Sequence, residues 1–187
     1  MPHVGVVKEV ETDAMFARVK QFVEVESQLG YRWIHVHAST PCSSGSPLKH
    51  FGTGGLSEAD VAWEGYHESC KYLTLGNSRS FELPRNSSIW KRDETKHVLK
   101  QCGLEFESEV FLCQTGCKAD NGLPVVKCLV FRSSFSGFCD VLTKRFGSCT
   151  CAKHACVTGV NWVKTGSNTM ELSKGILAAV EAARRAA

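Results

Sequence analysis

The sequence predicts an α/β fold, a sheet whose strands alternate along the chain with helices. Short runs of alternating apolar residues are separated by longer segments with helical periodicity, and several segments end at Gly or Pro. The chain has 187 residues, of which 43% are hydrophobic and 22% charged, so it can bury a core of its own. No repeat, low-complexity tract or linker divides it. We therefore expect a single domain over residues 1–187, with a Cys/His-rich loop at 147–158.

Each element has a local justification. Gly30 and Gly103 follow the last periodic residues of two helices, Ser57 is a suitable N-cap, and KADNGLP (118–124) is rich in turn residues. The last helix is dense in alanine and other good helix formers. The amino-terminal half is expected to form strands at 4–10 and 33–38, a helix at 13–30 and a helix that begins at Ser57. The rest is expected to form strands at 78–83, 108–114 and 125–131 and helices at 89–103 and 170–187.

Charge and cysteine usage restrict the class of protein. The net charge of +3 is compatible with a polyanionic partner without requiring one. No apolar run approaches the ~18–20 residues of a membrane span, and the first residues, MPHVGVVKEVETD, carry charges where a signal peptide is apolar. We therefore expect an intracellular protein, cytoplasmic or nuclear, whose ten cysteines are reduced. Four of them have apolar neighbours and are expected to be small core residues: Cys102, Cys113, Cys128 and Cys139.

Three chemically active side chains lie near the ends of predicted strands. Cys42 follows Pro41 after the strand at 33–38, Glu82 precedes Pro84, and Lys127 lies in the strand after the KADNGLP turn. In open α/β sheets, ligands bind beside the carboxyl ends of parallel strands. These residues therefore predict a site along one rim of the sheet.

The stretches STPCSS, SFELP and ADNGLPVVKCLVF, in this order, resemble motifs of the DNA cytosine-5 methyltransferases. The resemblance implies a Rossmann-like methyltransferase-type sheet flanked by helices, with Cys42 as the nucleophile that adds to cytosine. It implies that Glu82 holds the ring nitrogen and that Lys127 is a supporting cation. The partner would be nucleic acid, DNA rather than RNA, with the target base out of the stack.

The resemblance also implies S-adenosylmethionine as cofactor. VETDAMFARV is similar to a segment whose acidic residue contacts the cofactor ribose, which assigns Glu11. TGSNTMELSKGILAAV is similar to the final Gly-Asn motif, which assigns Asn168, and Pro41 of the Pro-Cys pair is the third expected cofactor contact.

The chain also departs from the family pattern. It has no Phe-x-Gly-x-Gly loop, and Val125 and Leu129 stand where the family has Gln and a second Arg. We therefore expect a sheet truncated at the amino terminus, in a module of the kind that mobile elements carry. An alternative is a non-catalytic nucleic-acid-binding or interaction module that has lost cofactor binding. In a further alternative, the Gly52–Gly55 loop takes over the cofactor contacts.

A second cluster lies in GSCTCAKHAC, where four soft ligands are candidates for tetrahedral zinc: Cys149, Cys151, His154 and Cys156. Four ligands so close in sequence would strain a tetrahedron, so three of them with a distant Cys117 or His67 form an alternative set. The chain would then be a small zinc-stabilised structural protein. Alternatively, the loop exposes free thiols beside basic residues and contacts phosphate.

Several other residues have two interpretations. Judged by itself, Cys42 is better explained as an exposed loop thiol, and it becomes a candidate for the site only together with the accompanying motifs. His35 and His37 share one strand face, where they flank Cys42, bind metal or form hydrogen bonds within the sheet. Gln114 is either a residue at the rim of the site or a solvated amide. Aromatic residues at helical positions are expected to be packing anchors: Trp63, Tyr66 and Trp90.

Overall fold

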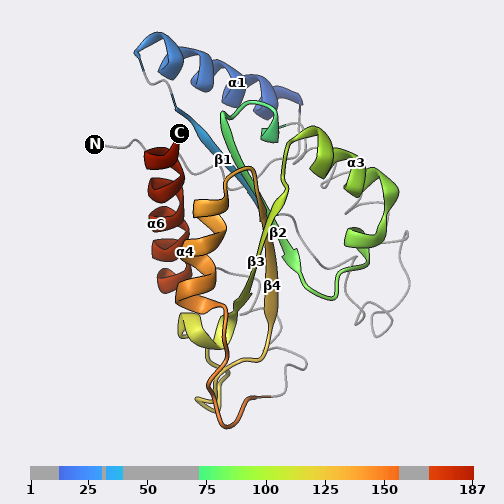
Figure 1. Cartoon of the computed structure of the whole chain (residues 1–187), viewed down its shortest axis with the longest axis vertical. Helices are drawn as coiled ribbons and strands as arrows, with labels where there is room; N and C mark the ends of the chain where they lie inside the picture. Colours follow the sequence, from blue (N-terminus) through green and yellow to red (C-terminus); the bar gives the residue numbers. More distant parts are fainter. Residues whose placement is uncertain (1–12, 31–32, 40–71, 156–168) are drawn as a thin grey trace.

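The computed structural model describes residues 13–30, 33–39, 72–155 and 169–187. Helices and strands are both present, which confirms the α/β class (Figure 1). The helices are α1 (Asp13–Gln28), α3 (Asp93–Gln101), α4 (Ser136–Phe146) and α6 (Met170–Ala186), with 3-10 turns η2 (Ser88–Lys91) and η3 (Leu112–Thr115). The strands are β1 (His35–Ser39), β2 (Ser78–Pro84), β3 (Phe106–Phe111) and β4 (Cys128–Ser133).

The four strands form one open, mixed sheet in the order β1-β2-β4-β3. β1 and β2 are parallel, in a register that pairs His35 with Ser78 and Ser39 with Glu82. β4 runs antiparallel to both β2 and β3. Two parallel strands need a long crossover connection, and the 38 residues between Ser39 and Ser78 provide the length for it.

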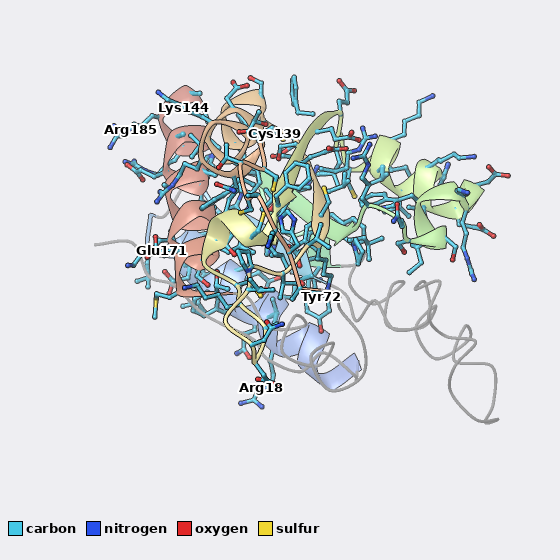
Figure 2. All side chains as sticks on the ribbon, turned by 90° about the horizontal axis from the view of Figure 1, so that it is seen from below. Arg18, Tyr72, Cys139, Lys144, Glu171 and Arg185 are labelled. Carbon is cyan, nitrogen blue, oxygen red and sulfur yellow. The ribbon has the colours of Figure 1, made fainter. Side chains whose placement is uncertain are left out.

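Helices lie on both faces of the sheet. α4 and α6 pack together on one side and α3 lies on the other (Figure 1). The first side holds the larger core, built around Phe131, Phe138, Leu142 and Leu172. Figure 2 shows Cys139 of α4 on the inner side of this layer, whereas Lys144 and Arg185 lie at its outer surface.

The smaller core lies between the sheet and α3. Phe81 and Leu83 of β2 are each 1% exposed there and pack with residues of η2 and α3. Trp90 meets Phe81 edge to face, and its indole N–H donates to the carbonyl of Pro84 at 2.9 Å. The expectation that Trp90 is a packing anchor is therefore confirmed, whereas Trp63 and Tyr66 lie outside the described residues.

Most described elements agree with the predictions from sequence. The helix expected at 13–30 ends at Gln28, with Gly30 at a φ of 90°, and the last helix spans Met170–Ala186. The strands expected at 33–38 and 78–83 are β1 and β2. The strand expected at 4–10 and the helix expected from Ser57 lie outside the described residues.

Three local expectations are corrected. The segment 136–146, for which no element was predicted, is α4. The helix expected at 89–103 is divided at Arg92, an extended residue (φ −71°, ψ 139°) between η2 and α3. The strand expected at 108–114 is shifted to Phe106–Phe111 and continues as η3, because β4 offers partners only from Cys128 to Ser133.

None of the helices in the described part of the chain combines the length and the apolar character that crossing a membrane requires.

Candidate functional site

The ends of β1 and β2 bring two polar side chains together. The parallel register places Ser39 beside Glu82, and the Ser39 hydroxyl donates to Glu82 Oε1 at 2.6 Å. Both residues are on the face that carries Phe131, which pairs with Glu82 across β4. We call this pair the strand-end site.

Glu82 lies in an unusual environment for a carboxyl group, because its side chain is buried, at 7% exposure. Burial raises the pKa of Glu82, and the Ser39 hydrogen bond and the charge of Lys127 only partly oppose this effect. Among the described residues, Oε2 of this carboxyl has no hydrogen-bond partner. A protonated carboxyl there has a donor available for a ligand.

Lys127 belongs to the same neighbourhood. It immediately precedes β4, its carbonyl accepts from the N–H of Leu112 at 2.9 Å, and its charge acts on Glu82. The strand expected at 125–131 thus begins one residue after Lys127, and the turn before it places this cation near the strand-end site.

Two histidines line the same face of β1. His35 hydrogen-bonds through Nδ1 to Ser78 Oγ and through Nε2 to Ser80 Oγ, each at 2.8 Å. His37 Nδ1 also meets Ser80 Oγ at 2.8 Å, and its ring stacks on Phe131. The interpretation of both as hydrogen-bonded strand residues is confirmed.

The remaining residues predicted for the first site lie outside the described residues. They are the nucleophile Cys42 and the cofactor contacts Glu11, Pro41 and Asn168. Glu82 and Lys127, the two predicted members that are described, lie close enough for the lysine charge to act on the carboxyl.

The metal-ligating side chains form a second cluster. Four ligand atoms lie within 4.8 Å of one another, and they belong to Cys113, Cys149, Cys151 and His154. We call these four residues the thiol–imidazole cluster. Three of them were predicted from sequence; the fourth predicted ligand, Cys156, lies outside the described residues.

The position of Cys113 differs from the core position expected from sequence. Its apolar neighbours in sequence indicated a core residue, but it lies in η3 with its Sγ 3.4 Å from Sγ of Cys149. The distant ligand suggested by the sequence, Cys117, is instead 7% exposed in the larger core. Cys102 and Cys139 are buried, as expected.

Short contacts continue through the cluster. Sγ of Cys149 is 3.1 Å from Nε2 of His154. The Gln114 amide nitrogen lies 3.6 Å from Sγ of Cys151 and 3.8 Å from Sγ of Cys113. Gln114 therefore contacts two sulfurs of this cluster and is not a solvated amide at the strand end.

The cluster perturbs its own thiols. The backbone N–H of Cys151 and the thiol of Cys113 lower the pKa of Cys149. Desolvation, followed by the hydrogen bond with Cys149, raises the pKa of Cys113 to about 12. Cys149 is therefore the more acidic thiol of the two.

Comparisons of the chain with protein-family profiles, with curated proteins and with solved structures find no match.

Proposed function

We propose that this chain is a cytosine-5 methyltransferase-like protein that grips an unstacked cytosine of DNA and adds the Cys42 sulfur to it. The observation that carries the proposal is the parallel pairing of β1 with β2, which sets Ser39 beside a buried Glu82. Cys42 is three residues beyond Ser39, at most about 11 Å of extended chain. The order β1-β2-β4-β3, with an antiparallel hairpin beside a parallel pair, also suits the carboxyl-terminal side of a methyltransferase-type sheet.

The raised pKa of Glu82 fits the proposed role. Nitrogen 3 of neutral cytosine is a hydrogen-bond acceptor, and burial favours the protonated form of Glu82, which can donate to it. Because Oε1 accepts from Ser39, Oε2 is the oxygen that carries the donor proton. Such a group acts as a general acid when negative charge develops on the ring.

The chemistry proceeds by conjugate addition. The Cys42 thiolate forms a bond to carbon 6, the double bond between carbons 5 and 6 shifts toward carbon 4, and nitrogen 3 takes the proton of Glu82. The resulting enamine is nucleophilic at carbon 5. It accepts a proton from solvent there and loses the original carbon 5 proton to water. Nitrogen 3 then returns its proton to Glu82 as the thiolate leaves carbon 6, which restores both cytosine and the general acid.

S-adenosylmethionine, when bound, would supply a methyl group to carbon 5. The residues that the resemblance assigns to it all lie outside the described residues. The steps proposed for this chain therefore stop at thiol addition and proton exchange.

The test is cofactor-independent exchange of the carbon 5 hydrogen. Single-stranded DNA containing cytosine is incubated with the protein in deuterium oxide, and the nucleosides are analysed by mass spectrometry. We expect deuterium at carbon 5 of cytosine, abolished by Cys42→Ser and slowed roughly 100-fold or more by Glu82→Gln, which cannot transfer a proton. The rate should fall as pH rises above the raised pKa of Glu82, since the general acid is then lost.

Matched variants control this experiment. Cys128→Ser removes a half-buried thiol at the start of β4, and Glu105→Gln removes an exposed carboxylate; neither should change the exchange rate. RNA of the same sequence tests the preference for DNA. Salt-dependent DNA binding without any exchange would contradict the catalytic proposal and favour the non-catalytic module.

A further inference from the structure

We propose that the thiol–imidazole cluster binds one zinc ion in a closed structural site that ties the segment after α4 to η3. This inference is independent of the proposed cytosine chemistry. The proposed site takes its ligands from two parts of the chain, with Cys113 and Cys149 36 residues apart. It replaces the set predicted from sequence, in which all four ligands came from one loop.

The spacing of the ligand atoms suits tetrahedral coordination. With zinc–sulfur bonds of about 2.3 Å and zinc–nitrogen bonds of about 2.0 Å, the edges of the tetrahedron are about 3.8 Å between sulfurs and about 3.5 Å between sulfur and nitrogen. The sulfurs of Cys113 and Cys149 are 3.4 Å apart, and Cys149 Sγ is 3.1 Å from His154 Nε2. Small outward shifts of these side chains accommodate a central ion.

The backbone already holds the two ligand segments together. The N–H of Ala155 donates to the carbonyl of Pro124 at 2.9 Å, and Val125 forms a parallel bridge with Ala155. The N–H of Val125 in turn donates to the carbonyl of Cys117, at 3.0 Å. Ala155 directly follows one ligand and Cys117 directly follows the turn that contains another, so these backbone hydrogen bonds bring the two ligand segments together.

Local structure explains how η3 presents its thiol. The Thr115 hydroxyl donates to the carbonyl of Leu112 at 2.8 Å, which closes the turn, and Gly116 ends it at a φ of 79°. A residue with a side chain is strained at this angle. In Figure 1, η3 and the segment that follows α4 lie at the same end of the molecule.

The donor set favours zinc and a structural role. Soft thiolates together with imidazole in a tetrahedral array select zinc over oxygen-preferring cations. Four protein ligands leave no open position for water or substrate, which is typical of structural sites. The Gln114 amide lies near two of the sulfurs, where its N–H groups reduce the negative charge of three thiolates on one ion.

A disulfide is the competing use of these thiols. The 3.4 Å between Cys113 and Cys149 is a non-bonded distance, far above the ~2.05 Å of a sulfur–sulfur bond. A disulfide would also not explain why the side chains of Cys151 and His154 lie within 4.8 Å of the same two sulfurs. A metal uses all four side chains.

The test is metal analysis of the purified full chain, with cobalt substitution as a second readout. We expect one zinc ion per chain after gel filtration, and cobalt spectra typical of tetrahedral coordination with thiolate charge-transfer bands. Less than stoichiometric metal in protein supplied with zinc under reducing conditions, or a Cys113–Cys149 disulfide under those conditions, would overturn the proposal.

Variants decide which residues are the ligands. Cys113→Ser should lose stoichiometric zinc, whereas Cys156→Ser and Cys128→Ser should keep it. The opposite result for Cys113 and Cys156 would restore the set predicted from sequence and refute ours. His154→Cys guards against a loss of folding, since it should retain metal and add a fourth thiolate to the cobalt spectrum.

The amide provides a graded test. Gln114→Ala should weaken zinc binding by about 10- to 100-fold, as expected when a hydrogen bond to a ligand is removed. Gln101→Ala, an exposed glutamine at the end of α3, is the matched control and should bind zinc normally. Equal affinities for the two variants would contradict the placement of Gln114 beside the metal.

Discussion

The two histidines of β1 are held in their neutral form. Desolvation and the neighbouring His37 lower the pKa of His35 to about 3, and desolvation lowers the pKa of His37 to about 4. Both rings bond to serine hydroxyls of β2 and stack on phenylalanines of the larger core. The charged imidazolium would lose this environment, so protonation favours the unfolded chain.

This predicts acid instability with a defined sign. Unfolded histidines take up protons below about pH 6.5, whereas the folded ones remain neutral until about pH 4 or lower, so stability falls as pH falls through this window. Each histidine contributes roughly 2 kcal/mol to the loss between pH 7 and pH 5. His37→Asn, which does not titrate, should reduce the loss by about that amount in urea denaturation.

Two features isolate the effect. Glu82 acts in the opposite direction, because its raised pKa stabilises the folded state as pH falls, so only the difference between variant and parent is informative. His97→Asn, on the exposed side of α3, is the control for the same substitution outside the core. A parallel loss of stability in parent and His37→Asn would show that His37 is accessible to protons when folded.

At the scale of elements, the α4–α6 pair depends on one small residue. Gly175 of α6 lies against the Phe146 ring of α4, and a Cβ at this position would come within 2.9 Å of Cζ and closer still to Cε2. Phe146 is itself buried in the larger core, so its ring has little room to move. Glycine therefore sets how closely the two helices approach.

Gly175→Ala should destabilise the protein by about 1 kcal/mol. Overpacking costs about 1–3 kcal/mol, and the better helix propensity of alanine offsets about 1 kcal/mol of it. Gly137→Ala in α4 is the matched control, because a Cβ there meets only the Ala182 carbonyl at 3.9 Å. It should stabilise by about 0.5–1 kcal/mol, and an equal gain for Gly175→Ala in thermal unfolding would argue against the close contact.

For the whole molecule, the sheet separates two cores. Phe138 packs with Phe131 and His35 on the side of α4 and α6, and Phe81 packs with Trp90 on the side of α3. Among the described residues, Phe138 and Phe81 belong to separate cores on opposite faces of the sheet, so their contributions to the free energy of unfolding should be independent.

Phe81→Leu and Phe138→Leu should each cost about 1 kcal/mol, and the double variant should equal their sum within about 0.5 kcal/mol. Equilibrium denaturation of the four proteins measures this cycle. A coupling well above that limit would mean that the two faces repack as one unit.

The sequence predicted some elements of the fold and missed others for identifiable reasons. β1, β2 and α6 have clear periodicity, and the KADNGLP turn is present, with Gly122 at a φ of 75° and the Asn121 side chain accepting from the N–H of Leu123. α4 was missed although Phe138, Leu142 and Phe146 recur every four residues, because small residues and a glycine begin the segment. Cys113 was misassigned because apolar neighbours in sequence do not reveal which side chains arrive from elsewhere.

By itself, the sequence determined the α/β class, the ends of several elements and the presence of soft ligands after residue 147, because periodicity, turn chemistry and ligand type are local properties. Only the tertiary structure decided that β4 inserts beside β2, that Glu82 is buried next to Ser39, and that Cys113 joins Cys149. Such pairings depend on which distant segments bury their apolar faces together, and residue spacing along the chain does not encode that competition.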